Sequence, residues 1–310
     1  LQINNCMSQI TLIEGKNIKE EKWDSCVNRF EFPLIYGNVW YLDLVCEEWD
    51  ALVNGDYDAI LPLPFKSKGG LNYVYRPYGV QQLGVFGDIS KTEELLSAIP
   101  AKYVWVDIFL NAGNELGKHI SKSTPQTNLI LDLSRSYESV YEGYSKQTKR
   151  NLKKAQKTSF GSFGYESPEQ LISLFKLNKG KDLDNLQEKQ YQKMTQIMHT
   201  LMHKNLGYIN SLYIEPNHLC AAAFFMEWKG RVTLLFSVTD DSGKETQAMT
   251  KLLDEFFIFR SNKPVLFDCV VDRVENCFPM IPSGKAHNEM ILSPEDEKET
   301  KISKAGKTLV

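Results

Sequence analysis

The sequence lacks the patterns that identify a metal site, a disulfide framework or a membrane span. No two of its six cysteines stand in a C-x-x-C pair, which disfavours a zinc site or a disulfide scaffold. No apolar run reaches about 18 residues, the length that a membrane-spanning helix needs. The first 15 residues have neither a basic segment nor an apolar one, so we expect no secretory signal there. These absences favour a cytoplasmic, bacterial-type protein with buried free thiols.

Several catalytic and nucleotide-binding motifs are missing as well. We find no P-loop, no dinucleotide-binding glycine fingerprint and no Ser-His-Asp set in the order of the chain. His199 and His203 have the i, i+4 spacing of a zinc-binding helix, but Thr-Leu-Met separates them and the glutamate of H-E-x-x-H is absent. We therefore expect solvated histidines, no metal and no bound cofactor.

The composition is that of an ordinary globular protein with a hydrophobic core. Hydrophobic residues make up 42% of the 310 residues, charged residues 24%, and the formal net charge is -3. At roughly 100–200 residues per domain, this length favours two domains. Strand-like and helix-like segments alternate along the chain, which predicts an α/β or α+β fold with mixed sheets.

The local patterns predict individual elements. Gly69-Gly70 and the turn Trp228–Arg231 each join two strand-like runs, as expected of hairpins. Ser167 and Pro168 are expected to begin a helix as its N-cap and first residue. Further helices are predicted within 18–30, 91–100, 185–205 and 247–262, and strands within 9–15, 102–110, 127–133 and 264–271.

The most unusual segment is YSKQTKRNLKKAQK at 144–157. On a helix its cations recur at i, i+3, i+4, i+7 and i+8 and lie on one face, while Leu152 and Ala155 lie off that face. Like charges four residues apart repel by roughly 0.2–0.5 kcal/mol per pair. Two interpretations stand level: a face that binds phosphates, or a helix paired with some of the chain's 39 acids. The cations are Lys146, Lys149, Arg150, Lys153, Lys154 and Lys157.

This basic segment resembles a K-x-R-N-x-x-K-A-x-K run of the FemABX-like acyltransferases. The stretch YVYRPYGVQQLGVFG at 73–87 is similar to the Y-x-x-x-P-x-x-Q-Q-L-G-V-F stretch of the same group, and VLFDCVVDRVENCF at 265–278 loosely resembles its D-F-x-G-S stretch. The resemblance implies two GNAT-like (Gcn5-related N-acetyltransferase) domains, at 8–145 and 146–290, with mostly antiparallel sheets flanked by helices. Residues 291–310 then form a polar tail.

The same resemblance implies an activity. GNAT-type proteins move an acyl group from a thioester or an aminoacyl-tRNA to an amine, and FemABX members add amino acids to peptidoglycan precursors. The implied donor is acyl-CoA or aminoacyl-tRNA, and the implied acceptor is a cell-wall precursor or a small amine. No membrane-spanning segment and no fixed oligomeric state are implied.

The sequence departs from the family pattern at two places. The loop that would hold a CoA pyrophosphate reads VTDDSGKETQAM, with Gly243 as its one glycine and acids at Asp240 and Asp241. Val270-Val271 follow Asp268, where the family has Gly-Ser. Both departures favour an alternative function, a non-catalytic protein that holds an anionic ligand on the same fold.

Acyl transfer needs a neutral amine, a stabilised oxyanion and a proton for the leaving group. Asp268 at the end of a buried strand and Lys285 are the candidate catalytic residues, with a helix cap and a solvated lysine as the alternatives. Candidate donor-binding groups are the basic segment and Gly243. An RNA-binding module is a third hypothesis, opposed by the negative net charge. Candidate substrate-binding residues, which could instead pack a hairpin and its loop, are Tyr75 and Tyr78, with Arg76 beside them, and the amides Gln81 and Gln82.

Overall fold

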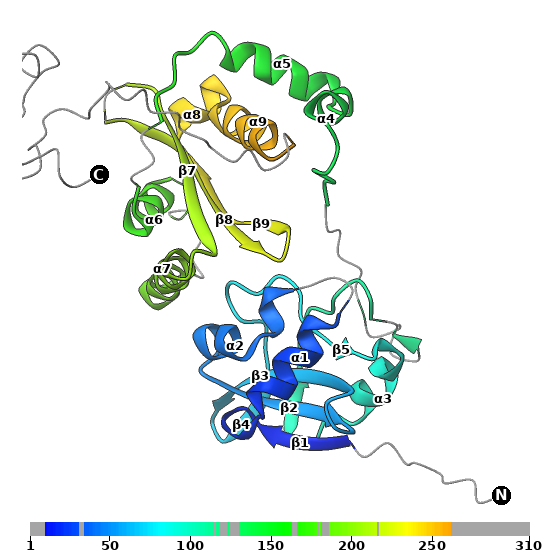
Figure 1. Ribbon diagram of the computed structural model, residues 1–310. Coiled ribbons are helices and arrows are strands. Elements are labelled where there is room, and N and C mark those ends of the chain that lie inside the picture. Colours follow the sequence, from blue (N-terminus) through cyan, green and yellow to red (C-terminus); the bar gives the residue numbers. More distant parts are fainter. Residues whose placement is uncertain are drawn as a thin grey trace, which may run out of the picture. The chain divides into compact units, whose positions relative to one another are not determined.

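The structure is a computed structural model. It describes residues 10–30, 34–114, 116–117, 123, 130–162, 166–178, 180, 186–215 and 217–261. Within these ranges the chain forms helices and two mostly antiparallel sheets, so the expected α+β class is confirmed (Figure 1). The division into GNAT-like domains near residue 145 stays a prediction. In the part of the chain that the structure describes, no helix is long and apolar enough to cross a membrane.

The first sheet has the strand order β1-β2-β3-β4-β6, and β5 pairs with β3. Paired strands in this sheet run antiparallel, except β4 and β6, which run parallel. The strands are β1 (Ile10–Glu14), β2 (Glu48–Asn54), β3 (Ala59–Lys68), β4 (Leu71–Val74), β5 (Phe86–Gly87) and β6 (Tyr103–Val106). The helices of this part are α1 (Glu20–Asn28), α2 (Val39–Val45) and α3 (Thr92–Ser97), with short 3-10 turns η1 (Gly15–Asn17), η2 (Ile35–Gly37) and η3 (Ile89–Lys91).

Strand β2 shows why this sheet carries helices on both faces. Successive side chains of a strand point to opposite faces. Trp49, Ala51 and Val53 belong to the buried cluster that includes Trp23 of α1. Leu52, between them, belongs to the cluster on the other face, which includes Leu95 of α3. A strand that is apolar on both faces therefore requires a helix on each.

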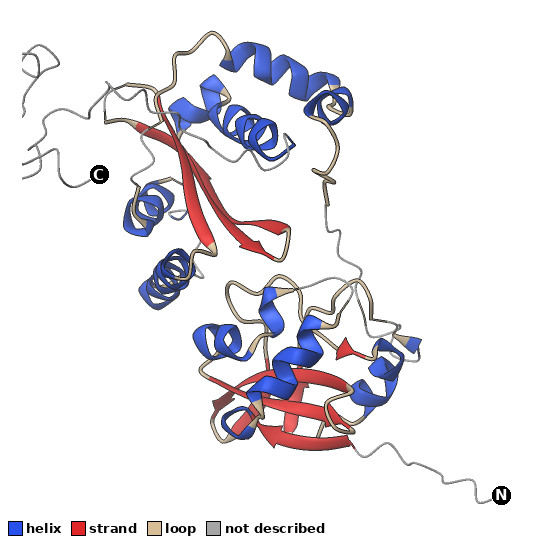
Figure 2. Ribbon diagram, viewed as in Figure 1, coloured by secondary structure: helices blue, strands red, loops and turns tan. Residues whose placement is uncertain are grey.

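The second sheet has the strand order β7-β8-β9 and is antiparallel throughout. Figure 2 shows its three strands with helices on both sides. The strands are β7 (Gly207–Tyr213), β8 (Leu219–Trp228) and β9 (Arg231–Thr239). The helices are α4 (Tyr137–Glu142), α5 (Lys146–Ala155), α6 (Pro168–Leu177), α7 (Glu188–His203), α8 (Asp241–Thr246) and α9 (Ala248–Ser261).

Strand β8 is buried along nearly its whole length, like β2. Ala222 and Phe224 share a buried cluster with Leu171 of α6 and Met198 of α7. The alternate residues of β8 pack in another cluster, which α9 completes with Ala248, Leu252 and Phe256. Helices α6 and α7 thus cover one face of this sheet, and α9 covers the other.

Most of the predicted elements are confirmed. Gly69 and Gly70 join β3 to β4 with φ of +60° and +81°, the left-handed pair that a tight hairpin turn requires. Ser167 accepts the backbone N–H of Gln170 in a capping box at the start of α6, with Pro168 at the first position. The strand predicted at 127–133 is wrong for its described part, because residues 130–133 have no strand structure. The strand predicted at 264–271 lies outside the described residues.

Three described cysteines are buried free thiols, as the sequence analysis expected. Burial raises the pKa of Cys26 and of Cys220 to about 11, and that of Cys46 to about 12. The thiolate is the reactive form of cysteine. These side chains are therefore protonated and inert at neutral pH.

We expect these three thiols to react with a disulfide reagent only after unfolding. In a variant with Cys6, Cys269 and Cys277 replaced by serine, the folded protein at pH 8 should react far more slowly than the same chain in denaturant. Spectrophotometric thiol titration measures both rates. Fast reaction of the folded variant would contradict the burial described here.

Gly87 holds the short strand β5 against β3. Its φ is +81°, and a Cβ there would lie 2.3 Å from the Asp58 carbonyl oxygen. Gly70 has the same φ of +81°, but nothing lies within 4 Å of its Cβ position. We expect Gly70→Ala to cost about 1 kcal/mol of unfolding free energy, from backbone strain alone. Gly87→Ala should cost about 2–4 kcal/mol, because overpacking is added. Urea unfolding of the two variants checks this difference, and equal losses would refute the crowding at Gly87.

Candidate functional site

The basic segment is a helix, as its spacing predicted. Helix α5 begins after Ser145, whose hydroxyl accepts the Thr148 backbone N–H at 3.0 Å. Leu152 and Ala155 are buried, and they fix which face points inward. Lys153 and Lys154 fall in the last turn, where the helix dipole favours positive charge.

The cations of α5 are not paired with acids in the part of the chain that the structure describes. Lys149 donates to the Glu142 carbonyl oxygen at 3.1 Å and lies 5.1 Å from the centroid of the Tyr141 ring, so it serves partly as a packing residue. The other cations of the basic segment are exposed and form no ion pair within the described ranges. They are Lys146, Arg150, Lys153, Lys154 and Lys157. The interpretation of internal compensation therefore has no support among these residues, and the anion-binding interpretation stays a prediction.

Two tyrosines beside α5 are anchored on a buried acid of α9. Tyr137 of α4 and Tyr144, which lies between α4 and α5, donate to the same Asp254 oxygen at 2.7 and 3.1 Å. Burial first, and then the neighbouring carboxylate, raise the pKa of both phenols. Both hydroxyls therefore stay protonated and able to donate. The segment that leads into α5 is thus attached to the second sheet's helix layer, which holds the cationic face in a fixed position.

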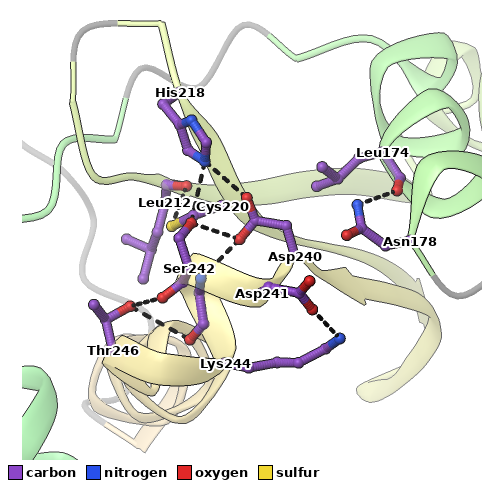
Figure 3. Close-up of polar contacts among 11 residues, drawn as sticks. Leu174, Asn178, Leu212, His218, Cys220, Asp240, Asp241, Ser242, Lys244 and Thr246 are labelled. Carbon is purple, nitrogen blue, oxygen red and sulfur yellow. Dashed lines mark hydrogen bonds and ion pairs between the residues drawn. The ribbon is translucent and has the colours of Figure 1, made fainter.

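In the loop expected to hold a donor pyrophosphate, an aspartate of the loop itself accepts the available hydrogen bonds (Figure 3). Asp240 is the N-cap of α8, and one of its carboxylate oxygens accepts the Gly243 backbone N–H at 2.7 Å and the Ser242 hydroxyl at 2.8 Å. His218 lies 2.7 Å from the other oxygen through Nε2. The Gly243 N–H that an anionic ligand would need is therefore already donated to a carboxylate of the protein.

Gly243 has a packing role in this loop. A Cβ at this position would lie 2.3 Å from the Cys220 carbonyl oxygen, so only glycine fits against β8. Its proposed role in donor binding is untested, and its N–H is already donated to Asp240.

His218, Asp240 and Ser242 form a cluster that the sequence analysis missed. In a nucleophilic triad the two ring nitrogens of histidine serve different partners. Here the same atom, Nε2, lies 2.7 Å from Asp240 and 3.1 Å from Ser242. The arrangement is therefore a network that supports the cap of α8 and not a proton relay to a serine nucleophile. No local motif could reveal it, because His218 belongs to a different part of the chain.

The predicted substrate-binding residues follow β4. A small hollow lies at the carboxyl ends of the parallel strands β4 and β6, the side of a parallel pair where ligands commonly bind. Tyr75 contributes to it, but Tyr78, Gln81 and Gln82 do not. The side chains that line the hollow come from Tyr75, Arg76, Pro77, Val80, Leu83, Ile108 and Phe109.

Arg76 in this hollow is already neutralised. Its Nε lies 2.9 Å from Asp107, and its guanidinium lies 4.3 Å from the centroid of the Phe109 ring. Tyr78 and Gln81 are exposed, and Gln82 is half-buried. The structure thus places Tyr75 and Arg76 together and leaves the two glutamines apart from them.

The predicted catalytic residues, Asp268 and Lys285, lie outside the described residues. Their catalytic roles therefore stay predictions. Among the described residues, no group of three or more His, Cys, Asp and Glu side chains could hold a metal ion. His199 is exposed and lies 2.6 Å from Glu169, as expected for a solvated histidine.

Comparison of the chain with models of protein families, and with curated proteins, gave no match.

The cap of α8 can be tested by stability. Asp240→Ala should lower the unfolding free energy by about 1–2 kcal/mol, because it removes the N-cap acceptor and the partner of His218. Its neighbour Asp241 is exposed and pairs with an exposed lysine in the same helix, so Asp241→Ala should cost about 0.5 kcal/mol or less. Chemical denaturation of both variants measures the difference. A larger loss for Asp241→Ala would show that the cap assignment is wrong.

Proposed function

We propose that the protein is an N-acyltransferase built from two GNAT-like units. The observation that carries the proposal is a repeated order of elements. In the first part, β1 is followed by α1 and α2, three antiparallel strands and α3. In the second part, a bridge between Gly161 and Tyr213 takes the place of β1, followed by α6 and α7, three antiparallel strands and α9. This repetition supports the tandem arrangement that the FemABX-like resemblance implies.

The donor is proposed to be a phosphate-bearing acyl carrier held by α5. The exposed cations of this helix have no acidic partner among the described residues, so phosphate oxygens would relieve their mutual repulsion. The start of α8 is a poorer site, because the carboxylate of Asp240 already accepts the Gly243 N–H. Acyl-CoA and aminoacyl-tRNA share the required phosphates and a reactive acyl bond.

The reaction is proposed to be attack of an amine on the acyl carbon of the donor. The nitrogen forms a bond to that carbon, the bond to sulfur or to ribose oxygen breaks, and the amine loses a proton while the leaving group gains one. Tyr75, Tyr78, Gln81 and Gln82 remain the proposed acceptor-binding residues, and Asp268 and Lys285 the proposed catalytic ones. A cell-wall precursor or a small amine is the proposed acceptor.

One observation favours a second function, a non-catalytic protein that binds an anionic ligand. The amide group with which a CoA-binding loop would hold pyrophosphate is occupied by Asp240. The cations of α5 could then serve binding alone. Turnover separates the two functions, because a binding protein releases no product.

We expect acyl transfer to depend on the exposed cations of α5. The assay combines acetyl-CoA, longer acyl-CoAs or aminoacyl-tRNA with small amines and a nucleotide-linked sugar peptide, and follows the product by mass spectrometry. Arg150→Ala/Lys154→Ala should raise the Kd of the active donor about tenfold, because two contacts of roughly 0.5–1 kcal/mol each are lost. The wild-type affinity should fall as salt rises.

A matched control removes the same charge elsewhere. Lys19 and Lys68 are exposed lysines whose side chains form no ion pair within the described ranges. Lys19→Ala/Lys68→Ala should leave donor affinity unchanged. Stability of the α5 variant should stay equal or rise slightly, since an i, i+4 repulsion is removed. Donor binding without product would favour the binding protein, and unchanged affinity with reduced stability would refute the role of α5.

A further inference from the structure

Glu166 is a buried acid that lacks the donors a buried charge needs. It lies directly before the N-cap of α6 and is only 6% exposed. Among the described residues, no backbone N–H and no lysine, arginine or histidine donates to either of its carboxylate oxygens. Burying an ionised carboxylate without enough hydrogen-bond donors is unfavourable, so this position calls for an explanation.

Tyr213 is the polar neighbour of this carboxylate. Burial, and then the charge of Glu166 and hydrogen bonding to it, raise the pKa of the Tyr213 phenol. A phenol has one proton and satisfies at most one carboxylate oxygen. At least one oxygen of Glu166 therefore has no donor among the described residues.

The other buried acids show how this protein normally treats such a charge. Asp50 is 3% exposed and accepts from Lys102 and Tyr103. Asp254 is 7% exposed and accepts from Tyr137 and Tyr144. Each thus has two donors, both on one carboxylate oxygen, within the described part of the chain. Glu166 has at most the single phenol of Tyr213 there, so a donor supplied by a ligand would give it the same number.

Ser211 is a second buried polar residue whose side chain has no hydrogen-bond partner among the described residues. It is 2% exposed. Ser211 lies two residues before Tyr213 on β7, so both side chains point to one face. Their cross-strand partners, Ala222 and Leu219, belong to the cluster that includes Leu171 and Phe175 of α6. This is the helix that Glu166 precedes.

We propose that Glu166, Tyr213 and Ser211 bind the ammonium group of a primary amine. An ammonium group has three N–H donors and one positive charge. Both carboxylate oxygens and the Ser211 hydroxyl can accept hydrogen bonds, and the carboxylate balances the charge. The inference rests on the proposed function, because the acceptor of that acyl transfer is an amine.

The test uses amines paired with uncharged molecules of similar size. Isothermal titration calorimetry of the full chain compares D-glucosamine with D-glucose, and ethanolamine with ethylene glycol. We expect binding of at least one amine and of neither uncharged partner. Glu166→Gln should weaken amine binding at least tenfold, and Ser211→Ala a few-fold. Binding of none of the amines by the wild-type protein would refute the proposal.

A matched control and a stability measurement guard against general damage. Glu169→Gln makes the same chemical change three residues later, at an exposed side chain that bonds His199, and should leave amine binding unchanged. Without ligand, Glu166→Gln should melt at or above the wild-type temperature, because it removes an uncompensated buried charge. A clear drop in its melting temperature would show that the carboxylate has a partner within the protein, and would overturn the inference.

The acyl-transfer assay on the same variants separates the two proposals. Amine binding that Glu166→Gln abolishes, in a wild-type protein that forms no acyl product with any donor, would support the site and refute the proposed function. Acyl transfer with an unchanged amine KM in Glu166→Gln would support the function and refute the site.

Discussion

The constraint on which the structure depends is that its central strands are apolar on both faces. In β8, the residues from Cys220 to Met226 are all buried, and in β2 so are those from Trp49 to Asn54. A strand of this kind exposes a large apolar area unless a layer of helices covers each side of the sheet. The positions of α6, α7 and α9 around β8 follow from this requirement. The polar groups of interest then lie where those helices begin or where the chain leads into them.

Charge is handled in three different ways around the second sheet. Asp254 is buried and receives two phenol hydroxyls, which fixes the segment leading into α5. Asp240 caps a helix and is held by His218, so its charge is satisfied at the sheet's end. The exposed cations of α5, and the buried carboxylate of Glu166, have no such compensation among the described residues.

The departure of the α8 loop from the expected donor-binding pattern has a structural consequence. A loop that binds pyrophosphate must present free backbone N–H groups. Here Asp240 accepts the N–H of Gly243, and Gly243 packs against the backbone of Cys220. The glycine is thus retained for close packing while the acid takes the place of the anion. The basic helix α5 is left as the anion-binding candidate in the described part of this half of the chain.

Much of the fold could be predicted because its signals are local. Apolar strand-like runs, the Gly69-Gly70 turn and the cap formed by Ser167 and Pro168 each depend on residues a few positions apart. The basic face of α5 is of the same kind, since the i, i+4 spacing alone puts its cations on one side. The strand predicted at 127–133 failed in its described part, because an apolar run indicates burial in a strand only if a neighbouring strand pairs with it.

The sequence by itself predicted many of the helices and strands and the face on which α5 carries its charge. It could not determine which polar groups meet. Glu166 stands in the stretch GYESPEQ, which reads as a solvated helix start, and the neighbour of its carboxylate, Tyr213, lies in a later strand. His218 meets Asp240 only because β8 and β9 pair. Desolvation and hydrogen bonding depend on distances between segments that are remote in the chain, so only the tertiary structure decided which charges have partners among the described residues and which do not.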